Sequence, residues 1–211
     1  MKEQIARLFH NMIRQGAGRI PQEETGSEQE RNVDLTTPAP PVSGGTMGRM
    51  LADLADQKAF SAMIDEILQE RECRGGFLIV DVDRFKEVNN TYGHEAGDDV
   101  LQNVVDLLQD VFCNNRCFGR LGGDTFALWV SEEDKDSCVR HRIAVINDRL
   151  LHPDRQLPPV SLSAGLAYCE EGDDCRSLGR RAVRAMNRVK ECGRCGFEVY
   201  GENILDNSRT I

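Results

Sequence analysis

The stretch GRLGGDTFALWV, residues 119–130, predicts a β-hairpin whose two short strands meet at Gly122-Gly123, with Asp124 at the turn. Glycines permit the positive φ of a tight turn, and they let a bulky group approach the backbone closely. Taken alone, the two glycines also fit an ordinary hairpin turn. The acid beside them makes the hairpin a candidate binding site as well as a piece of sheet.

An apolar strand that ends on carboxylates is predicted upstream of the hairpin, in GFLIVDVD, residues 76–83. Asp81 and Asp83 would reach the edge of the sheet, where they can contact a cation together with a main-chain carbonyl such as that of Val82. Asp124 supplies a third carboxylate from the hairpin. Magnesium suits this arrangement, because it takes few protein carboxylates and uses waters and phosphates as its other ligands.

The chain from about residue 46 onward has the pattern of an α+β domain. Apolar residues at helical spacing and further apolar strands alternate along it: helices at 50–70, 97–112, 141–151 and 175–193, strands at 159–168 and 196–201. The order βαββαβ matches the ferredoxin-like plan, in which helices cover one face of a mostly antiparallel central sheet. Such a sheet keeps its other face or an edge for binding.

Composition divides the chain into four segments. Residues 15–45 are dense in Gly, Pro, Ser, Thr and acids and predict a flexible linker, while residues 204–211 form a tail after a domain of residues 46–203. Residues 1–14 predict an amphipathic helix with one apolar stripe: Ile5, Leu8, Phe9, Met12 and Ile13. The stripe fits docking on the chain's own domain, pairing with a partner protein or a second copy, and less well a membrane surface.

Charge and cysteine spacing exclude several classes of function. The net charge of −9 opposes binding to nucleic acid, and no apolar run approaches the roughly 20 residues of a membrane span. The first residues lack the apolar core of a secretory signal, so the expected compartment is the cytoplasm. The closest cysteine pairs, Cys113/Cys117 and Cys192/Cys195, lie about 75 residues apart, so reduced thiols are expected rather than a structural zinc site.

The segment DVDRFKEVNNTYGHEAGDDVL, residues 81–101, together with RLGGDTF and KECGR, resembles the GGDEF family, the diguanylate cyclases of bacterial signalling. The resemblance runs from about residue 46 to residue 200 and implies the nucleotide-cyclase palm fold. In that family two domains face each other, each with one GTP, and each 3′ oxygen attacks the other α-phosphate to give cyclic di-GMP and two pyrophosphates. It therefore implies GTP as substrate, Mg²⁺ or Mn²⁺ as cofactor, and a homodimer for catalysis.

The resemblance also assigns roles to individual residues. The metal ligands would be two carboxylates and one carbonyl: Asp81, Asp124 and Val82. Asp124 would help to deprotonate the attacking hydroxyl, and Lys190 would act with it in catalysis. The guanine edge would be bound by Asn89 and Asp98, and the phosphates would be neutralised by Lys86, Lys190 and Arg194. The pocket would be shaped by Phe85, Gly122 and Gly123.

Several positions depart from the family pattern. Thr125 replaces the second acid of the signature, and a hydroxyl brings no charge and weaker ligation to magnesium. If about 3 kcal/mol of stabilisation were lost, turnover would fall on the order of a hundredfold. Asn90 replaces an Asp, Asn187 replaces an aromatic residue, Cys195 replaces an Asn, and the lead-in helix RMLADLADQKAF, residues 49–60, keeps only part of its pattern.

The family's product-inhibition motif, R-x-x-D, is absent at its usual spacing. Cys113 and Arg116 stand at the two positions, so no feedback binding of cyclic di-GMP through this motif is expected. Two classes of function stay open: a cyclase slowed by Thr125, and a degenerate domain that binds GTP or a protein. A scaffold that binds no nucleotide is a third. A cyclase needs dimers and two metals, a GTP sensor needs only binding, and a scaffold needs neither.

Overall fold

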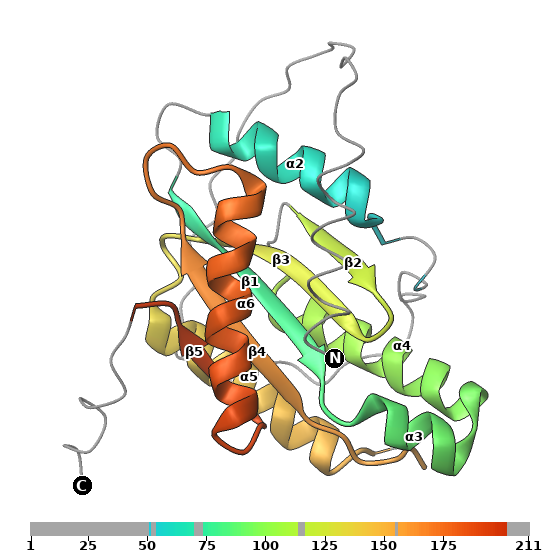
Figure 1. The fold of residues 1–211 in the computed structure, drawn as a ribbon. Helices are drawn as coiled ribbons and strands as arrows, with labels where there is room; N and C mark the ends of the chain where they lie inside the picture. The colour runs from blue at the N-terminus through green and yellow to red at the C-terminus, as the bar shows by residue number, and fades with distance from the viewer. Residues whose placement is uncertain (1–50, 52–53, 70–73, 114–116, 155, 202–211) are drawn as a thin grey trace, which may run out of the picture. The chain divides into compact units, whose positions relative to one another are not determined.

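The computed structural model describes residues 51, 54–69, 74–113, 117–154 and 156–201. The helix predicted at residues 1–14, the linker at 15–45 and the tail at 204–211 lie outside the described residues. In the described part, five strands form a single sheet in the order β2-β3-β1-β4-β5 (Figure 1). Their bounds are β1 Gly75–Val82, β2 Phe118–Gly122, β3 Thr125–Ser131, β4 Leu162–Tyr168 and β5 Gly196–Val199.

The sheet is mostly antiparallel, as predicted. Strand β1 lies at its centre and pairs antiparallel with both β3 and β4, while β2 pairs antiparallel with β3 and only β5 runs parallel to its neighbour β4. Asp81, near the end of β1, stands opposite Thr125 of β3 on one side and Ser163 of β4 on the other. The register therefore brings the hairpin and β4 to the same end of the central strand.

Helices cover both faces of the sheet. The helices are α2 Gln57–Gln69, α3 Phe85–Tyr92, α4 His94–Val111, α5 Asp136–Leu151 and α6 Cys175–Glu191. Apolar residues of α4 and α5 pack with Leu78 and Val80 of β1, whereas those of α2 and α6 pack with Phe77 and Ile79 on the opposite face (Figure 1). The α+β fold class is confirmed, but the expectation of helices on one face only is wrong, because β1 is apolar on both sides.

Two local details also differ from the sequence prediction. The turn of the hairpin consists of Gly123 and Asp124, because Gly122 is still the last residue of β2 and pairs with Thr125. Helix α3 was not predicted, since its eight residues bury only Val88 and leave no periodic apolar signal. In the part of the chain that the structure describes, no helix combines the length and the apolar character needed to cross a membrane.

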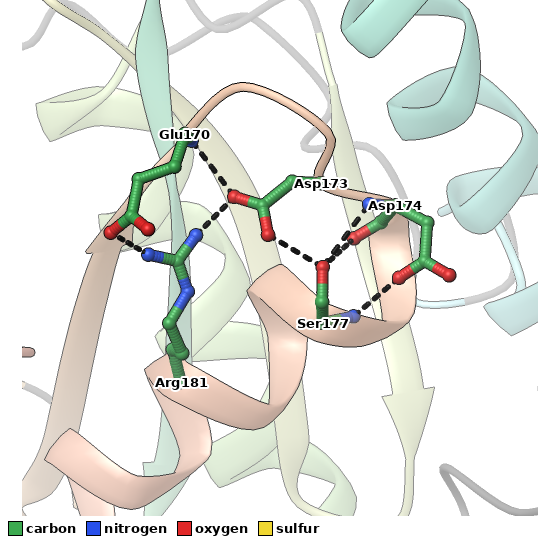
Figure 2. Close-up of polar contacts among 5 residues, drawn as sticks. All are labelled: Glu170, Asp173, Asp174, Ser177 and Arg181. Atoms are coloured by element: carbon green, nitrogen blue, oxygen red, sulfur yellow. Dashed lines mark hydrogen bonds and ion pairs between the residues drawn. The ribbon is translucent and has the colours of Figure 1, made fainter.

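Polar contacts anchor the N-terminal end of α6 (Figure 2). The side chain of Asp174 accepts a hydrogen bond from the backbone N–H of Ser177, and the Ser177 hydroxyl accepts one from the backbone N–H of Asp174. This capping box satisfies donors that a helix start leaves open. Arg181, one turn further, pairs with both Glu170 and Asp173 of the preceding loop. The start of α6 is therefore fixed to the loop after β4.

Close packing and a specific turn hold the rest of α6. A Cβ at Gly165 of β4 would lie 2.3 Å from the Ala182 carbonyl oxygen and 2.3 Å from the Met186 nitrogen, so only glycine lets the helix approach β4 this closely. At the other end Gly193 has φ 114°, and the N–H of Arg194 bonds to the Val189 carbonyl at 2.9 Å. This is the Schellman pattern of a helix stop. The last turn of α6 is thereby held beside the end of β1.

Candidate active site

Asp81, near the end of β1, is paired with a cation from α6. It is 3% exposed, and its Oδ1 lies 2.5 Å from Lys190 Nζ, while its Oδ2 accepts a hydrogen bond from the Thr125 hydroxyl at 3.0 Å. Burial raises the pKa of Asp81, and the Lys190 ammonium opposes that rise. The structure thus brings together Asp81 and Lys190, predicted as metal and phosphate contacts, across 109 residues of sequence.

Asp124 lies close to Asp81 in the hairpin turn. The backbone N–H of Val82 donates to the Asp124 carbonyl at 3.1 Å, which ties the turn to the end of β1. Burial and then the negative charge of Asp81 raise the pKa of Asp124 to about 6. Two neighbouring carboxylates carry like charges that repel each other, and a cation bound beside both of them relieves that repulsion.

One divalent ion fits this pair of carboxylates. Mg²⁺ commonly uses one or two protein carboxylates and completes its shell with waters and phosphates. Among the described residues, no three His, Cys, Asp or Glu side chains gather as a ligand set. Thr125 stands where a third acid would be needed, and its hydroxyl is already bonded to Asp81. In the part of the chain that the structure describes, this leaves the neighbouring carboxylates Asp81 and Asp124 as the candidate ligands.

Asp83 is not one of the two carboxylates of the proposed metal pair, Asp81 and Asp124, and its expected contact with a cation beside Asp81 stays a prediction. Its Oδ1 accepts a hydrogen bond from the Ser163 hydroxyl at 2.7 Å, and its Oδ2 accepts from the Ser161 hydroxyl at 2.7 Å and from the Cys195 backbone N–H at 3.1 Å. Arg194 Nε lies 3.9 Å from Oδ1. Asp81 and Asp83 alternate in the sequence, yet their carboxylates contact two different sets of groups.

A second group of predicted residues lies on α3 and at the start of α4. The Oδ1 atom of Asn89 is buried and has no hydrogen-bond partner in the described structure. A Cβ at Gly97 would lie 1.9 Å from this Oδ1 and 3.2 Å from Phe85 Cζ, so the Asn89 side chain occupies the space that glycine leaves. An unpaired buried acceptor costs free energy unless a donor reaches it. The position is therefore suited to a ligand that carries an N–H group.

The remaining predicted residues are more open. Lys86, Asp98 and Gly123 are exposed, and Gly122 is half-buried. A Cβ at Gly123 would meet no atom within 4 Å, but its φ of 54° favours glycine. Arg194 also has a positive φ, 72°, and its side chain is 37% exposed.

Sequence reasoning missed two residues that shape the site. The sequence did carry a signal for Gly97, because a glycine in a helical pattern often marks a close contact. Arg120 gave no such signal, because its partner depends on the hairpin turn. The Arg120 guanidinium donates to the Gly123 carbonyl at 2.9 Å and 2.5 Å, and its charge partly offsets the raised pKa of Asp124.

The chain is similar to proteins of one family. A family model described as "Diguanylate cyclase, GGDEF domain" matches residues 50–195. A protein named diguanylate cyclase from Vibrio cholerae serotype O1 is 32% identical over 152 residues, which cover 71% of this chain and 46% of that protein. The cyclic di-GMP phosphodiesterase NbdA of Pseudomonas aeruginosa is 26% identical over 168 residues, which cover 74% of this chain and 21% of that protein. The chain thus spans less than half the length of these curated relatives.

A solved structure has the same fold. The GGDEF domain of DgcB from Caulobacter crescentus, crystallised in complex with c-di-GMP, superposes with a TM-score of 0.65 at 26% identity, over 76% of this chain and 99% of that chain. The residues that the family model matches, 50–195, include β1, the hairpin and α6, and thus Asp81, Asp124 and Lys190. The chain belongs to the GGDEF domain family, the family of the diguanylate cyclases.

Proposed function

We propose that this chain binds GTP with one divalent ion and condenses two GTP molecules into cyclic di-GMP, at a rate lowered by Thr125. The observation that carries the proposal is the meeting of Asp81, Asp124 and Lys190 at the end of β1, two carboxylates and a cation from distant parts of the chain. Phosphoryl transfer needs charge neutralisation and positioning more than covalent chemistry by the protein. This cluster offers both at one sheet edge.

The cofactor assigned to this site is Mg²⁺ or Mn²⁺, held by Asp81, Asp124 and the Val82 carbonyl. When bound, such an ion neutralises phosphate charge and lowers the pKa of an attached hydroxyl. Asp124 is also the proposed acceptor for the proton of the attacking hydroxyl. Lys190 acts beside it by stabilising the charge that develops on the phosphates.

The substrate is held at both of its ends. Asn89 and Asp98 bind the guanine edge, and the unpaired Asn89 Oδ1 gives this end its selectivity, because a base without a matching donor leaves that buried oxygen unsatisfied. The phosphates are bound by cations from α3 and from the end of α6: Lys86, Lys190 and Arg194. Phe85 and the turn glycines Gly122 and Gly123 leave room for the nucleotide.

Condensation needs two copies of the domain, because each GTP supplies the nucleophile for the other. The apolar stripe of residues 1–14 is the proposed means of pairing, through a second copy or a partner protein. The domain borders proposed are residues 46–203. GTP is a cytoplasmic nucleotide, which places the proposed activity in the cytoplasm, and the net charge of −9 gives no support to a nucleic-acid partner.

A second function is favoured by one specific residue. Thr125 takes the place of an acid, so the site has two neighbouring carboxylates where a two-ion site would have more. A domain that still binds GTP but turns it over too slowly to matter would act as a nucleotide-dependent interaction module. This alternative shares every binding contact with the first and differs only in the chemical step.

The experiment is cyclic di-GMP formation by the purified chain from GTP, with Mg²⁺ or Mn²⁺, measured by mass spectrometry beside Asp124→Ala and Thr125→Glu. Product from the natural chain that disappears in Asp124→Ala supports the cyclase. Product only in Thr125→Glu supports a binding module disabled at one position. GTP binding without product in all three also favours the module, and no GTP binding at all refutes both functions.

A further inference from the structure

Asp83 joins three separate segments although it lies outside the metal pair. It is 5% exposed, and its carboxylate accepts hydrogen bonds from Ser161 and Ser163, which flank the first residue of β4, and from the Cys195 N–H after α6. Its own backbone N–H donates to the Ser161 carbonyl at 2.8 Å. A buried carboxylate with this many donors is held in one orientation.

The turn that Asp83 holds has an unusual backbone. Gly193, Arg194 and Cys195 have consecutive positive φ values of 114°, 72° and 54°. Residues with a Cβ disfavour this region, so Arg194 and Cys195 keep it only if other contacts compensate. Two contacts do so: the Arg194 N–H bonds to the Val189 carbonyl at 2.9 Å, and the Cys195 N–H bonds to Asp83 Oδ2 at 3.1 Å. The second depends on Asp83 alone.

The Asp83 carboxylate also lies beside the Arg194 side chain, but the two do not form a close ion pair. Arg194 Nε is 3.9 Å from Asp83 Oδ1, at the limit of an ion pair, and 37% of the Arg194 side chain is exposed. A guanidinium at this separation is oriented by the negative charge and still has free N–H donors. Asp83 therefore acts on Arg194 twice, through the backbone at Cys195 and through charge at Nε.

We propose that Asp83 is a positioning residue, which sets the turn after α6 so that Arg194 faces the phosphates of the nucleotide. The inference rests on the proposed function, in which Arg194 binds those phosphates. Asp83 then contributes to affinity for the phosphates and not for the base, because Asn89 and Gly97 belong to a different group of contacts on α3 and α4. A substitution of Asp83 should therefore change the affinity for a ligand with phosphates and not the affinity for the nucleoside.

The test compares binding of 3′-deoxy-GTP, which lacks the attacking hydroxyl and is not turned over, with binding of 3′-deoxyguanosine, both by calorimetry with Mg²⁺ present. Asp83→Asn keeps the size of the side chain but removes one acceptor and the charge. It is expected to weaken 3′-deoxy-GTP about tenfold and to leave 3′-deoxyguanosine unchanged. In an Arg194→Ala background, Asp83→Asn is expected to weaken 3′-deoxy-GTP less than threefold.

A matched control separates positioning from folding. Asn147, like Asp83, is a buried polar residue bonded to this end of β4, through the Leu162 N–H and carbonyl, but it does not touch the turn after α6. Asn147→Asp should lower the thermal stability without changing the ratio of the two affinities. Amide hydrogen exchange, which needs no nucleotide, should be faster at Cys195 in Asp83→Asn than in the natural chain.

Four outcomes would overturn the inference. Equal weakening of both ligands by Asp83→Asn would indicate a general structural role, and so would a full tenfold effect that persists without Arg194. Unchanged exchange at Cys195 would show that Asp83 does not hold the turn. If Asp83→Asn binds 3′-deoxy-GTP as tightly as the natural chain does, the positioning role alone is wrong. If the natural chain binds neither ligand, the proposed function is wrong as well.

Discussion

Acids and bases cluster at both ends of α6, but the two clusters have different roles. At the first end, the single cation Arg181 pairs with two acids, Glu170 and Asp173, and bonds to both of them (Figure 2). At the last turn, Lys190 pairs with Asp81, but burial and the Asp81 charge still raise the pKa of nearby Asp124 to about 6. The first cluster satisfies itself and stabilises the helix. In the second cluster Asp124 is partly buried and its pKa is raised to about 6, so its charged form is disfavoured until a cation binds beside it.

The largest expected effect is at Thr125. Thr125→Glu adds a carboxylate beside Asp81 and Asp124, and with divalent ion present it should raise the rate of cyclic di-GMP formation on the order of a hundredfold, equivalent to about 3 kcal/mol. The measurement is the initial rate at saturating GTP. Thr125→Gln is the matched control, with similar size and no charge. An equal gain in the glutamine variant would contradict the electrostatic explanation.

A smaller effect is expected at Gly97. In Gly97→Ala the new Cβ would lie 1.9 Å from Asn89 Oδ1, so the Asn89 side chain must move. We expect GTP affinity to fall about tenfold, or about 1.4 kcal/mol, with less discrimination against ATP, because Oδ1 no longer meets the base. Calorimetry with both nucleotides tests this. Gly172→Ala, where a Cβ would meet no atom within 4 Å but φ is +85°, tests whether backbone strain far from Asn89 changes the selectivity. Unchanged selectivity would remove Asn89 from base recognition.

The self-satisfied end of α6 should respond in stability alone. Arg181→Ala removes the partner of Asp173, whose side chain is only 10% exposed, and should lower the free energy of unfolding by about 1–2 kcal/mol without altering GTP affinity. Urea denaturation and calorimetry measure the two quantities. Arg180→Ala, on an exposed position of the same helix, should change neither. A loss of GTP affinity in Arg181→Ala would mean that the two ends of α6 are coupled.

The smallest effect is the pH dependence that Asp124 imposes. Its pKa is about 6 in the folded chain against an ordinary 3.8, so the folded state holds this proton more tightly, and stability from this group falls as pH rises from about 4 to 6. Two units correspond to at most about 3 kcal/mol, and solvent screening at this half-buried site reduces that to about 1 kcal/mol.

Asp124→Asn removes this cost. With a chelator present, its free energy of unfolding should exceed that of the natural chain by about 1 kcal/mol at pH 7.5, and the difference should disappear as the pH falls below about 3.8, where Asp124 is neutral in both the folded and the unfolded chain. Urea unfolding across this pH range measures the difference. A constant difference between the two proteins at every pH would show that the effect does not come from ionisation of Asp124.

Much of this protein is determined by local sequence. The alternating and apolar runs of β1, the hairpin and α6 depend on periodicity and turn chemistry, which neighbouring residues set, so the α+β order and the mostly antiparallel sheet were predictable. The motif around DVDRFK and GGDTF also marked Asp81 and Asp124 as members of one family's site. Thr125 was visible as a departure without any structure.

Other features were decided by tertiary structure, because they depend on which segments pack together. Helices on both faces follow from α2 and α6 meeting the second apolar face of β1. The pairing of Lys190 with Asp81 joins residues 109 positions apart, and periodicity carries no information on such contacts. Asp81 and Asp83 look equivalent in sequence, yet the strand register and the turn after α6 place Asp81 beside Asp124 and Lys190 and surround Asp83 with donors from Ser161, Ser163 and Cys195.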